Sequence, residues 1–218
     1  MEPEKSMKPN QMLHKVLMTL LALLILFLMF MYGWRALGAA KRKPAVSLPV
    51  YHSVTPFELT ERTGKIVTLA DLRGKIGVFC FIFTRCPGPC PTLTLRMYEI
   101  QNIVKKVPVQ LVSVSIDPFD TPEVLTKYAN KYDAWGDRWW FLTGPEQAIH
   151  ALCKNTFLLP VEKNPQEAIA KEGEYMHSGK LILVDAQGVI RGYYDGQDPT
   201  VVPRISADIG KLIKEAGL

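Results

Sequence analysis

Residues 76–91 constrain the fold more than any other part of the chain, because an apolar run leads directly into two cysteines and a helix start. The nearly continuous apolar segment from Ile76 to Phe83 is typical of a strand buried on both faces of a sheet. It is followed by Cys86-Pro87-Gly88-Pro89-Cys90-Pro91. Pro91 suits the first turn of a helix, so we expect Cys90 to be the N-cap of a helix that reaches about Lys106. Both thiols should therefore lie at the carboxyl end of a buried strand.

The spacing of the two cysteines leaves two kinds of chemistry open. Three residues separate them, whereas the usual disulfide oxidoreductase motif has two, and the longer spacing leaves room for a soft metal ion. The amino end of a helix favours a thiolate at Cys90, and the neighbouring Arg85 should add to this effect. Cys80 and Cys153 fall at apolar positions and are expected to be small buried side chains.

The remaining pattern predicts an α/β sandwich. We expect a hairpin from strands 57–60 and 66–69, a strand at 109–116, a helix capped by Thr121, a short strand at 139–142 and a helix to about Thr156. Thr143 to Glu146 resembles a capping box for that last helix. A long polar loop over 160–176 precedes a hairpin of strands 180–185 and 189–194 and a closing helix over 201–216. This is the element order of a thioredoxin-like fold.

The amino-terminal region predicts a single membrane-spanning helix. No charged residue occurs from Val16 to Gly33, and this run can cross a hydrocarbon core of roughly 30 Å. Tyr32 and Trp34 suit the membrane interface. We therefore predict a tail over 1–15, an anchor over 16–34 and a linker over 35–56. The alternative is a cleaved secretory signal with a processing site in the small residues of 36–40, although the apolar run exceeds the usual signal core.

The net charge of +5 does not indicate a nucleic-acid partner. Residues 1–43 hold seven Lys or Arg and two Glu, and the rest of the chain holds 19 basic and 19 acidic residues. The excess positive charge thus brackets the apolar run on both sides, so the positive-inside rule does not fix the orientation. Export of the carboxyl-terminal domain is our working assumption.

Of the four histidines, His177 is the candidate metal ligand. His14 lies beside the anchor and His52 in the linker, and both are expected to be solvated, while His150 should lie at the edge of an apolar helix stripe. His177 instead ends the long loop, immediately before an apolar strand, where it can project over the edge of the sheet. Met176 beside it has a thioether suited to copper, but it is better read as a loop hydrophobe.

From about Phe57 to its end, the chain resembles the Sco (SenC) family of copper proteins. Phe83-Thr84-Arg85-Cys86, Cys90-Pro91, Asp117-Pro118 with Asp120-Thr121-Pro122, Leu142-Thr143-Gly144 and His177 before Leu181-Ile182-Leu183-Val184-Asp185 carry the likeness. The hairpin and Asp71-Leu72-Arg73-Gly74-Lys75 also match but are shared with other thioredoxin relatives.

The resemblance implies a thioredoxin-like domain over 57–218 that binds copper through Cys86, Cys90 and His177, with Cu(I) as the main candidate ion and Cu(II) as a second. It implies a metallochaperone for cytochrome c oxidase rather than an enzyme, with a copper donor protein and the copper-bearing oxidase subunit as partners. The lipid bilayer would be contacted through residues 16–34, with the domain on the outer side, and the absence of an Arg- and Ser-rich transit peptide favours a bacterial periplasm over the mitochondrial intermembrane space.

The alternative function is thiol–disulfide exchange on an exported or oxidase-subunit protein, with Cys86 attacking and Cys90 resolving the mixed disulfide. Two departures from the family pattern bear on the choice. Gly88, between its two prolines, and Met176 stand where family members usually carry acidic residues. Both departures remove negative charge near the metal and bear chiefly on affinity for Cu(II).

Overall fold

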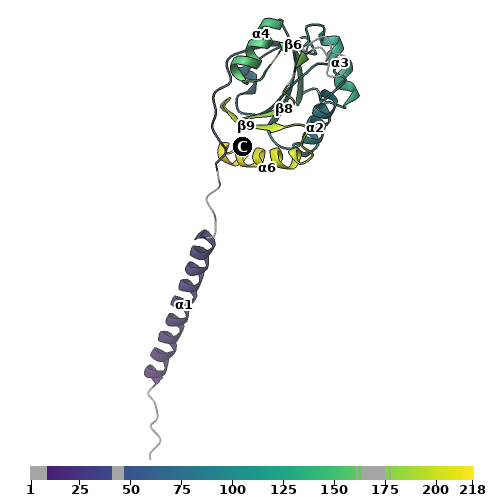
Figure 1. The fold of residues 1–218 in the computed structure, drawn as a ribbon. Coiled ribbons are helices and arrows are strands. Elements are labelled where there is room, and N and C mark those ends of the chain that lie inside the picture. Colours follow the sequence, from purple (N-terminus) through teal and green to yellow (C-terminus); the bar gives the residue numbers. More distant parts are fainter. Residues whose placement is uncertain (1–8, 41–46, 161, 164–174, 177) are drawn as a thin grey trace, which may run out of the picture. The chain divides into compact units, whose positions relative to one another are not determined.

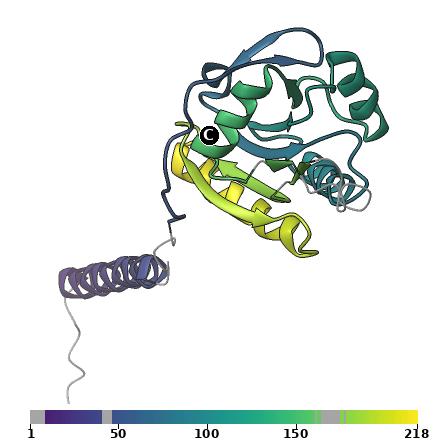
Figure 2. The same ribbon diagram turned by 45° about the horizontal axis from the view of Figure 1, so that its top comes forward.

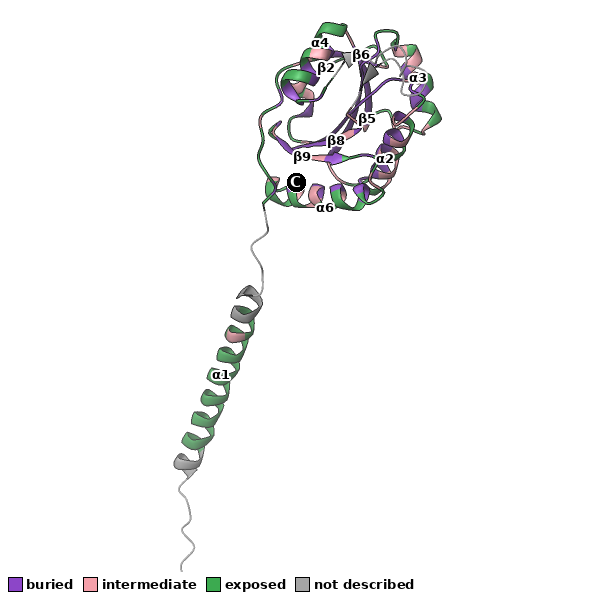
Figure 3. Ribbon diagram, viewed as in Figure 1, coloured by how far each residue is buried: buried purple, intermediate pink, exposed green. Residues whose placement is uncertain are grey.

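The computed structural model describes residues 9–40, 47–160, 162–163, 175–176 and 178–218, which form two compact units divided after Val46. The first unit contains helix α1 (Pro9–Ala40), whose large apolar side chains are exposed (Figure 3). Within it, Leu13–Arg35 has a mean hydropathy of 2.6 and is long and apolar enough to cross a membrane. The predicted span over 16–34 lies inside this segment. A signal sequence near the amino terminus has the same properties.

The second unit, Ser47–Leu218, contains a seven-stranded sheet with the strand order β2-β1-β5-β4-β3-β8-β9 (Figure 1). Its strands are β1 (Glu58–Glu61), β2 (Ile66–Thr68), β3 (Ile76–Ile82), β4 (Val109–Ser115), β5 (Trp139–Thr143), β8 (Lys180–Val184) and β9 (Ile190–Asp195). Strands β3, β4 and β5 are parallel, whereas β1 and β8 run antiparallel to their neighbours. A separate pair is formed by β6 (Glu162–Lys163) and β7 (Tyr175–Met176).

Helices cover both faces of the sheet (Figures 1 and 2). They are the 3₁₀ turn η1 (Leu69–Leu72), α2 (Cys90–Ile103), α3 (Pro122–Lys131), α4 (Glu146–Ala151), the π turn η2 (Leu152–Thr156) and α6 (Val201–Ala216). All seven residues of β3 are buried, as its unbroken apolar run predicts. Successive side chains of β3 therefore pack against the helices on opposite faces of the sheet. The predicted α/β element order is confirmed, except that the loop predicted over 160–176 contains the paired strands β6 and β7.

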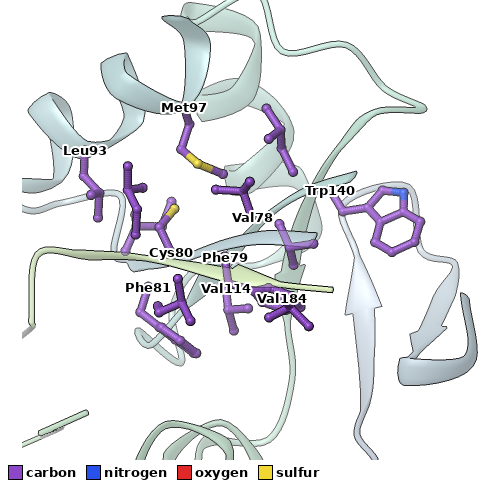
Figure 4. Close-up of a cluster of buried hydrophobic side chains, with 14 of the residues drawn as sticks. Val78, Phe79, Cys80, Phe81, Leu93, Met97, Val114, Trp140 and Val184 are labelled. Carbon is purple, nitrogen blue, oxygen red and sulfur yellow. The ribbon is translucent and has the colours of Figure 1, made fainter. Parts of the chain in front are cut away.

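The two faces of β3 pack against different elements (Figure 4). Val78 and Cys80 point toward Leu93 and Met97 of α2. Phe79 and Phe81 point the other way, and their rings lie 5.1 and 5.2 Å from that of Phe157, which follows η2. Packing on both faces thus holds β3 in place directly before the cysteine loop.

Two helix boundaries differ from the prediction. Helix α2 ends at Ile103 rather than near Lys106, because the chain must turn before Pro108 to enter β4. Thr143 does not cap α4, since it is the last residue of β5 and pairs with Thr60. Pro145 occupies the cap position without a side-chain bond, so the predicted capping box is wrong. The helix also changes to a π turn over Leu152–Thr156.

Residues 47–56, which we expected to belong to a linker, lie along the edge of the domain. Ser53 forms a β-bridge with Val189, and the carbonyls of Leu48 and Pro49 accept hydrogen bonds from Arg191. Ring Nε2 of His52 contacts the carbonyl oxygen of Thr156. The expectation that His52 is solvated is therefore wrong, because this segment adds to the sheet edge in spite of its prolines.

Candidate metal centre

Cys86 lies in a tight turn at the carboxyl end of β3. Its N–H donates to the carbonyl of Phe83 over 3.2 Å, and the N–H of Ile116 donates to the carbonyl of Ile82 over 2.9 Å. The second bond aligns the carboxyl ends of β3 and β4. Cys86 is only 7% exposed, so its thiol lies just beneath the surface at the predicted edge of the sheet.

Cys90 is the first residue of α2 and is 1% exposed. The cap is Pro89, one residue earlier than predicted, and its carbonyl accepts from the N–H of Leu93 over 3.0 Å. The Thr94 hydroxyl donates to the Cys90 carbonyl over 2.9 Å. The first turn of the helix thus holds the second thiol beside the first.

The two thiols are hydrogen-bonded to one another. Both cysteines are in the free form, and a hydrogen bond with Cys86, followed by burial and the proximity of Cys86, raises the pKa of Cys90 far above its ordinary value. The helix amino terminus therefore does not make Cys90 a thiolate, contrary to our expectation. Within the loop, the N–H of Gly88 donates a hydrogen bond to Sγ of Cys86 over 3.4 Å. A metal ion that binds both sulfurs as thiolates must displace the thiol protons, which makes its binding stronger as the pH rises.

Arg85 is paired with a buried carboxylate. Oδ2 of Asp117 accepts from Nε and Nη2 of Arg85 over 3.0 and 2.8 Å. The guanidinium also lies 5.3 Å from the ring centre of Phe119. Asp117 is fully buried, whereas the Arg85 side chain is 58% exposed. The carboxylate offsets much of the positive charge that we expected Arg85 to direct at the thiols.

His177 lies outside the described residues, so its role as a ligand stays a prediction. Within the described ranges no group of three His, Cys, Asp or Glu side chains is close enough to hold an ion. The strand that follows His177 does begin at the cysteine end of the sheet, because Leu181 pairs with Cys80 in antiparallel register. The topology is compatible with the predicted third ligand.

A close backbone contact joins this strand start to the segment after β9, beside the Leu93 side chain of α2. The N–H of Gly196, after β9, donates to the carbonyl of Gly179 over 2.9 Å. A Cβ atom at Gly196 would lie 2.3 Å from Cδ1 of Leu93 and 2.8 Å from that carbonyl oxygen. Only a glycine at position 196 allows the Gly179 carbonyl to lie this close to the first turns of the helix that begins with Cys90.

The other two cysteines and His150 do not belong to the site. Cys80 and Cys153 are fully buried. Burial raises the pKa of Cys80 to about 12 and also raises that of Cys153. This confirms that both are small buried side chains. Nε2 of His150 lies 3.8 Å from Oε1 of Glu146, its neighbour on α4.

Several residues without a predicted role support the cysteines. Asp117 is one, and the buried Tyr128 is another, since its hydroxyl lies 2.9 Å from that of Thr94. A signal for Asp117 was present, because Asp117-Pro118 begins two residues after the last residue of β4. Parallel neighbouring strands end at the same edge, so a polar residue there faces the cysteine loop. No comparable signal exists for Tyr128.

Comparisons with known proteins agree with this arrangement. The SCO1/SenC family model matches residues 47–214. The SCO1 protein homolog of Bacillus subtilis is 33% identical over 165 residues, which cover 74% of this chain and 83% of that protein.

Two solved structures extend the comparison. BsSco, described as a member of the Sco family of cytochrome c oxidase assembly proteins with a disulfide switch, is 29% identical with a TM-score of 0.68 over 78% of this chain and 99% of that one. Copper-bound ScoI of Bradyrhizobium japonicum is 25% identical with a TM-score of 0.61 over 73% and 99% of the two chains. The fold is thus the thioredoxin-like fold of Sco proteins, and the chain belongs to the SCO1/SenC family.

Proposed function

We propose that this chain is a membrane-tethered copper-binding protein that delivers copper during assembly of cytochrome c oxidase. The observation that carries the proposal is the pair of reduced, buried thiols of Cys86 and Cys90, hydrogen-bonded to one another at the carboxyl end of β3. Thiolates are soft donors suited to Cu(I). The copper-bound relative in the same family supports copper as the cargo.

His177 is the proposed third ligand. Imidazole binds both oxidation states of copper, and the strand start beside it lies at the cysteine end of the sheet. Three ligands, one of them outside the cysteine loop, suit an ion that must be released, whereas a closed shell of four suits structural zinc. Replacement of the two family acids by Gly88 and Met176 favours Cu(I) over the more strongly charged Cu(II).

The proposed location is a membrane surface with the domain on the outer side, most consistent with a bacterial periplasm. Helix α1 supplies the tether by its length and composition. The partners are then a copper donor and the copper-bearing oxidase subunit. No described feature of the domain indicates nucleic acid, since the excess of positive over negative charge is confined to residues 1–43.

Thiol–disulfide exchange is the second candidate, and the contact between the two thiols favours it specifically. Sulfurs close enough to form a hydrogen bond need little movement to form a disulfide. The disulfide switch described for BsSco supports this possibility. The two functions are compatible, because an oxidised pair cannot bind copper as thiolates and a reduced pair can.

The His177→Ala variant tests the proposed site. We expect its Cu(I) affinity to fall by about 100-fold, since one ligand of a thiolate and imidazole site contributes roughly 3 kcal/mol. The measurement is anaerobic titration of the reduced protein against a competing Cu(I) chelator. His150→Ala, on α4, is the matched control and should bind copper as the wild type does. Equal affinities for all three proteins would remove His177 from the site.

Gly196→Ala tests whether the close contact beside Gly179 brings the third ligand to the thiols. The added methyl would meet Cδ1 of Leu93 at 2.3 Å and the carbonyl oxygen of Gly179 at 2.8 Å, so the contact between Gly196 and Gly179 beside α2 must open. We expect a stability loss of about 1–3 kcal/mol and a Cu(I) affinity about tenfold lower, by analogy with other changes in the surroundings of metal ligands. Gly210→Ala on α6, where a Cβ meets nothing within 4 Å, is the control. An unchanged affinity in Gly196→Ala would contradict the role of this contact.

A further inference from the structure

Asp120 is a buried carboxylate that lies directly behind the cysteine loop. It is 1% exposed and follows β4 by five residues. Oδ2 accepts from the N–H of Thr84 over 2.9 Å and from the Ser115 hydroxyl over 2.5 Å. Oδ1 accepts from the Thr84 hydroxyl over 2.5 Å. Two of these three hydrogen bonds go to one residue of the cysteine loop.

Thr84 connects this carboxylate to Cys86. It lies inside the turn closed by the hydrogen bond from the N–H of Cys86 to the carbonyl of Phe83. Both the backbone and the side chain of Thr84 are fixed by Asp120, so the path of the loop between β3 and Cys86 is fixed as well. The Ser115 hydroxyl fixes the carboxylate itself against the end of β4.

The buried contact should hold the loop more firmly than the ion pair beside it. Arg85 and Asp117 also join the loop to the segment after β4, but the Arg85 side chain is 58% exposed although Asp117 is buried, so solvent screens this pair from one side. Hydrogen bonds to a buried charged group contribute more per bond. Loss of the Asp120 carboxylate would leave the N–H of Thr84 without its acceptor, which the loop can correct only by moving.

We infer that Asp120 is a positioning residue that sets the geometry of Cys86 relative to Cys90, and through it both the copper affinity and the disulfide equilibrium of the pair. The inference rests on the proposed function for its copper readout only. The disulfide equilibrium depends on the same geometry without any metal, because pre-organised thiols react with one another as if at high local concentration.

The test uses the full chain in detergent and three variants. Asp120→Ala removes both acceptor oxygens, and Asp120→Asn keeps one of them. Asp185→Ala is the matched control, because Asp185 is also buried and accepts from the N–H groups of Gln187 and Val189 and from Arg191. It follows Val184, which pairs with Gly77, so it lies at the opposite end of β3 from Cys86.

Two quantities are measured. The first is the equilibrium constant for the reaction of the protein dithiol with glutathione disulfide, which gives the protein disulfide and two molecules of glutathione. The second is the Cu(I) affinity against a competing chelator. We expect Asp120→Ala to lower both by about tenfold or more, as do other changes behind metal ligands, with Asp120→Asn between it and the wild type. Asp185→Ala should lower the melting temperature while both quantities stay within about twofold of the wild type.

The outcomes separate this inference from the proposed function. A wild-type protein that binds no copper would contradict the proposed function, and the glutathione equilibrium would still decide the role of Asp120. If Asp120→Ala does not fold, Asp120→Asn supplies the same comparison. An equilibrium within about twofold of the wild type in the folded Asp120 variants, or an equal shift in Asp185→Ala, would overturn the inference.

Discussion

Replacing Cys90 with Ser will lower the Cu(I) affinity of the reduced protein by about 1000-fold, and replacing Cys86 with Ser will do the same. Metal sites of four such ligands bind with roughly 10–16 kcal/mol, so one thiolate contributes about 4 kcal/mol. A hydroxyl is a hard donor that does not replace it. The two thiols are hydrogen-bonded to one another, so both can contact one ion, and removal of either leaves a single soft sulfur donor in the loop. Competition titration under anaerobic conditions measures the loss.

The buried thiol of Cys153 supplies the control for this prediction. It lies in η2, on the face of the sheet that carries Phe79 and Phe81. Cys153→Ala should cost stability without changing copper affinity, because a cavity in the core acts on folding. Tight copper binding by Cys86→Ser or Cys90→Ser would contradict the two-thiolate site.

Removing residues 1–46 will transfer the protein from the membrane fraction to the soluble fraction. Leu13–Arg35 is the only segment of the described residues that is long and apolar enough to span a bilayer. A spanning helix holds a protein in the membrane almost irreversibly. The shortened chain should stay folded, because Ser47–Leu218 forms a compact unit with its own core. Fractionation of cells that express either form, followed by thermal unfolding of the soluble one, makes the measurement.

The competing account of this segment is a cleaved signal. In that case the full chain would also be recovered in the soluble fraction, and its amino terminus would begin after the small residues of 36–40. Amino-terminal sequencing of the cellular protein distinguishes the two accounts. An intact amino terminus in the membrane fraction is the result that we expect.

The fold could be predicted from the sequence because its main signals involve residues close together in the chain. The apolar run of β3, the cysteines that follow it and the proline in the first turn of α2 are local signals, and the structure places each element close to its predicted residues. The ends of helices and strands were harder to predict where a residue distant in the sequence competes for the same backbone or side-chain groups. Thr143 is the example, since it pairs with Thr60 instead of capping α4.

The candidate site divides in the same way. Cys86 and Cys90 could be predicted because only three residues separate them in the sequence and thiols have a distinctive chemistry. Asp120 could not, since its partner Thr84 is 36 residues away and only the parallel pairing of β3 and β4 brings them together. The contact of His52 with Thr156 spans 104 residues and left no sequence signal. Side chains that position a site depend on such contacts more than the ligands themselves do.

The most direct test of the copper site is the stoichiometry of Cu(I) binding in the two redox states of the Cys86–Cys90 pair. The protein is titrated anaerobically, once with both thiols reduced and once with the disulfide formed. We predict one copper ion per chain in the reduced state and none in the oxidised state, because the thiolates are the soft donors of the site. Equal uptake in both states, or no uptake by the reduced protein, would contradict a copper site built on these two cysteines.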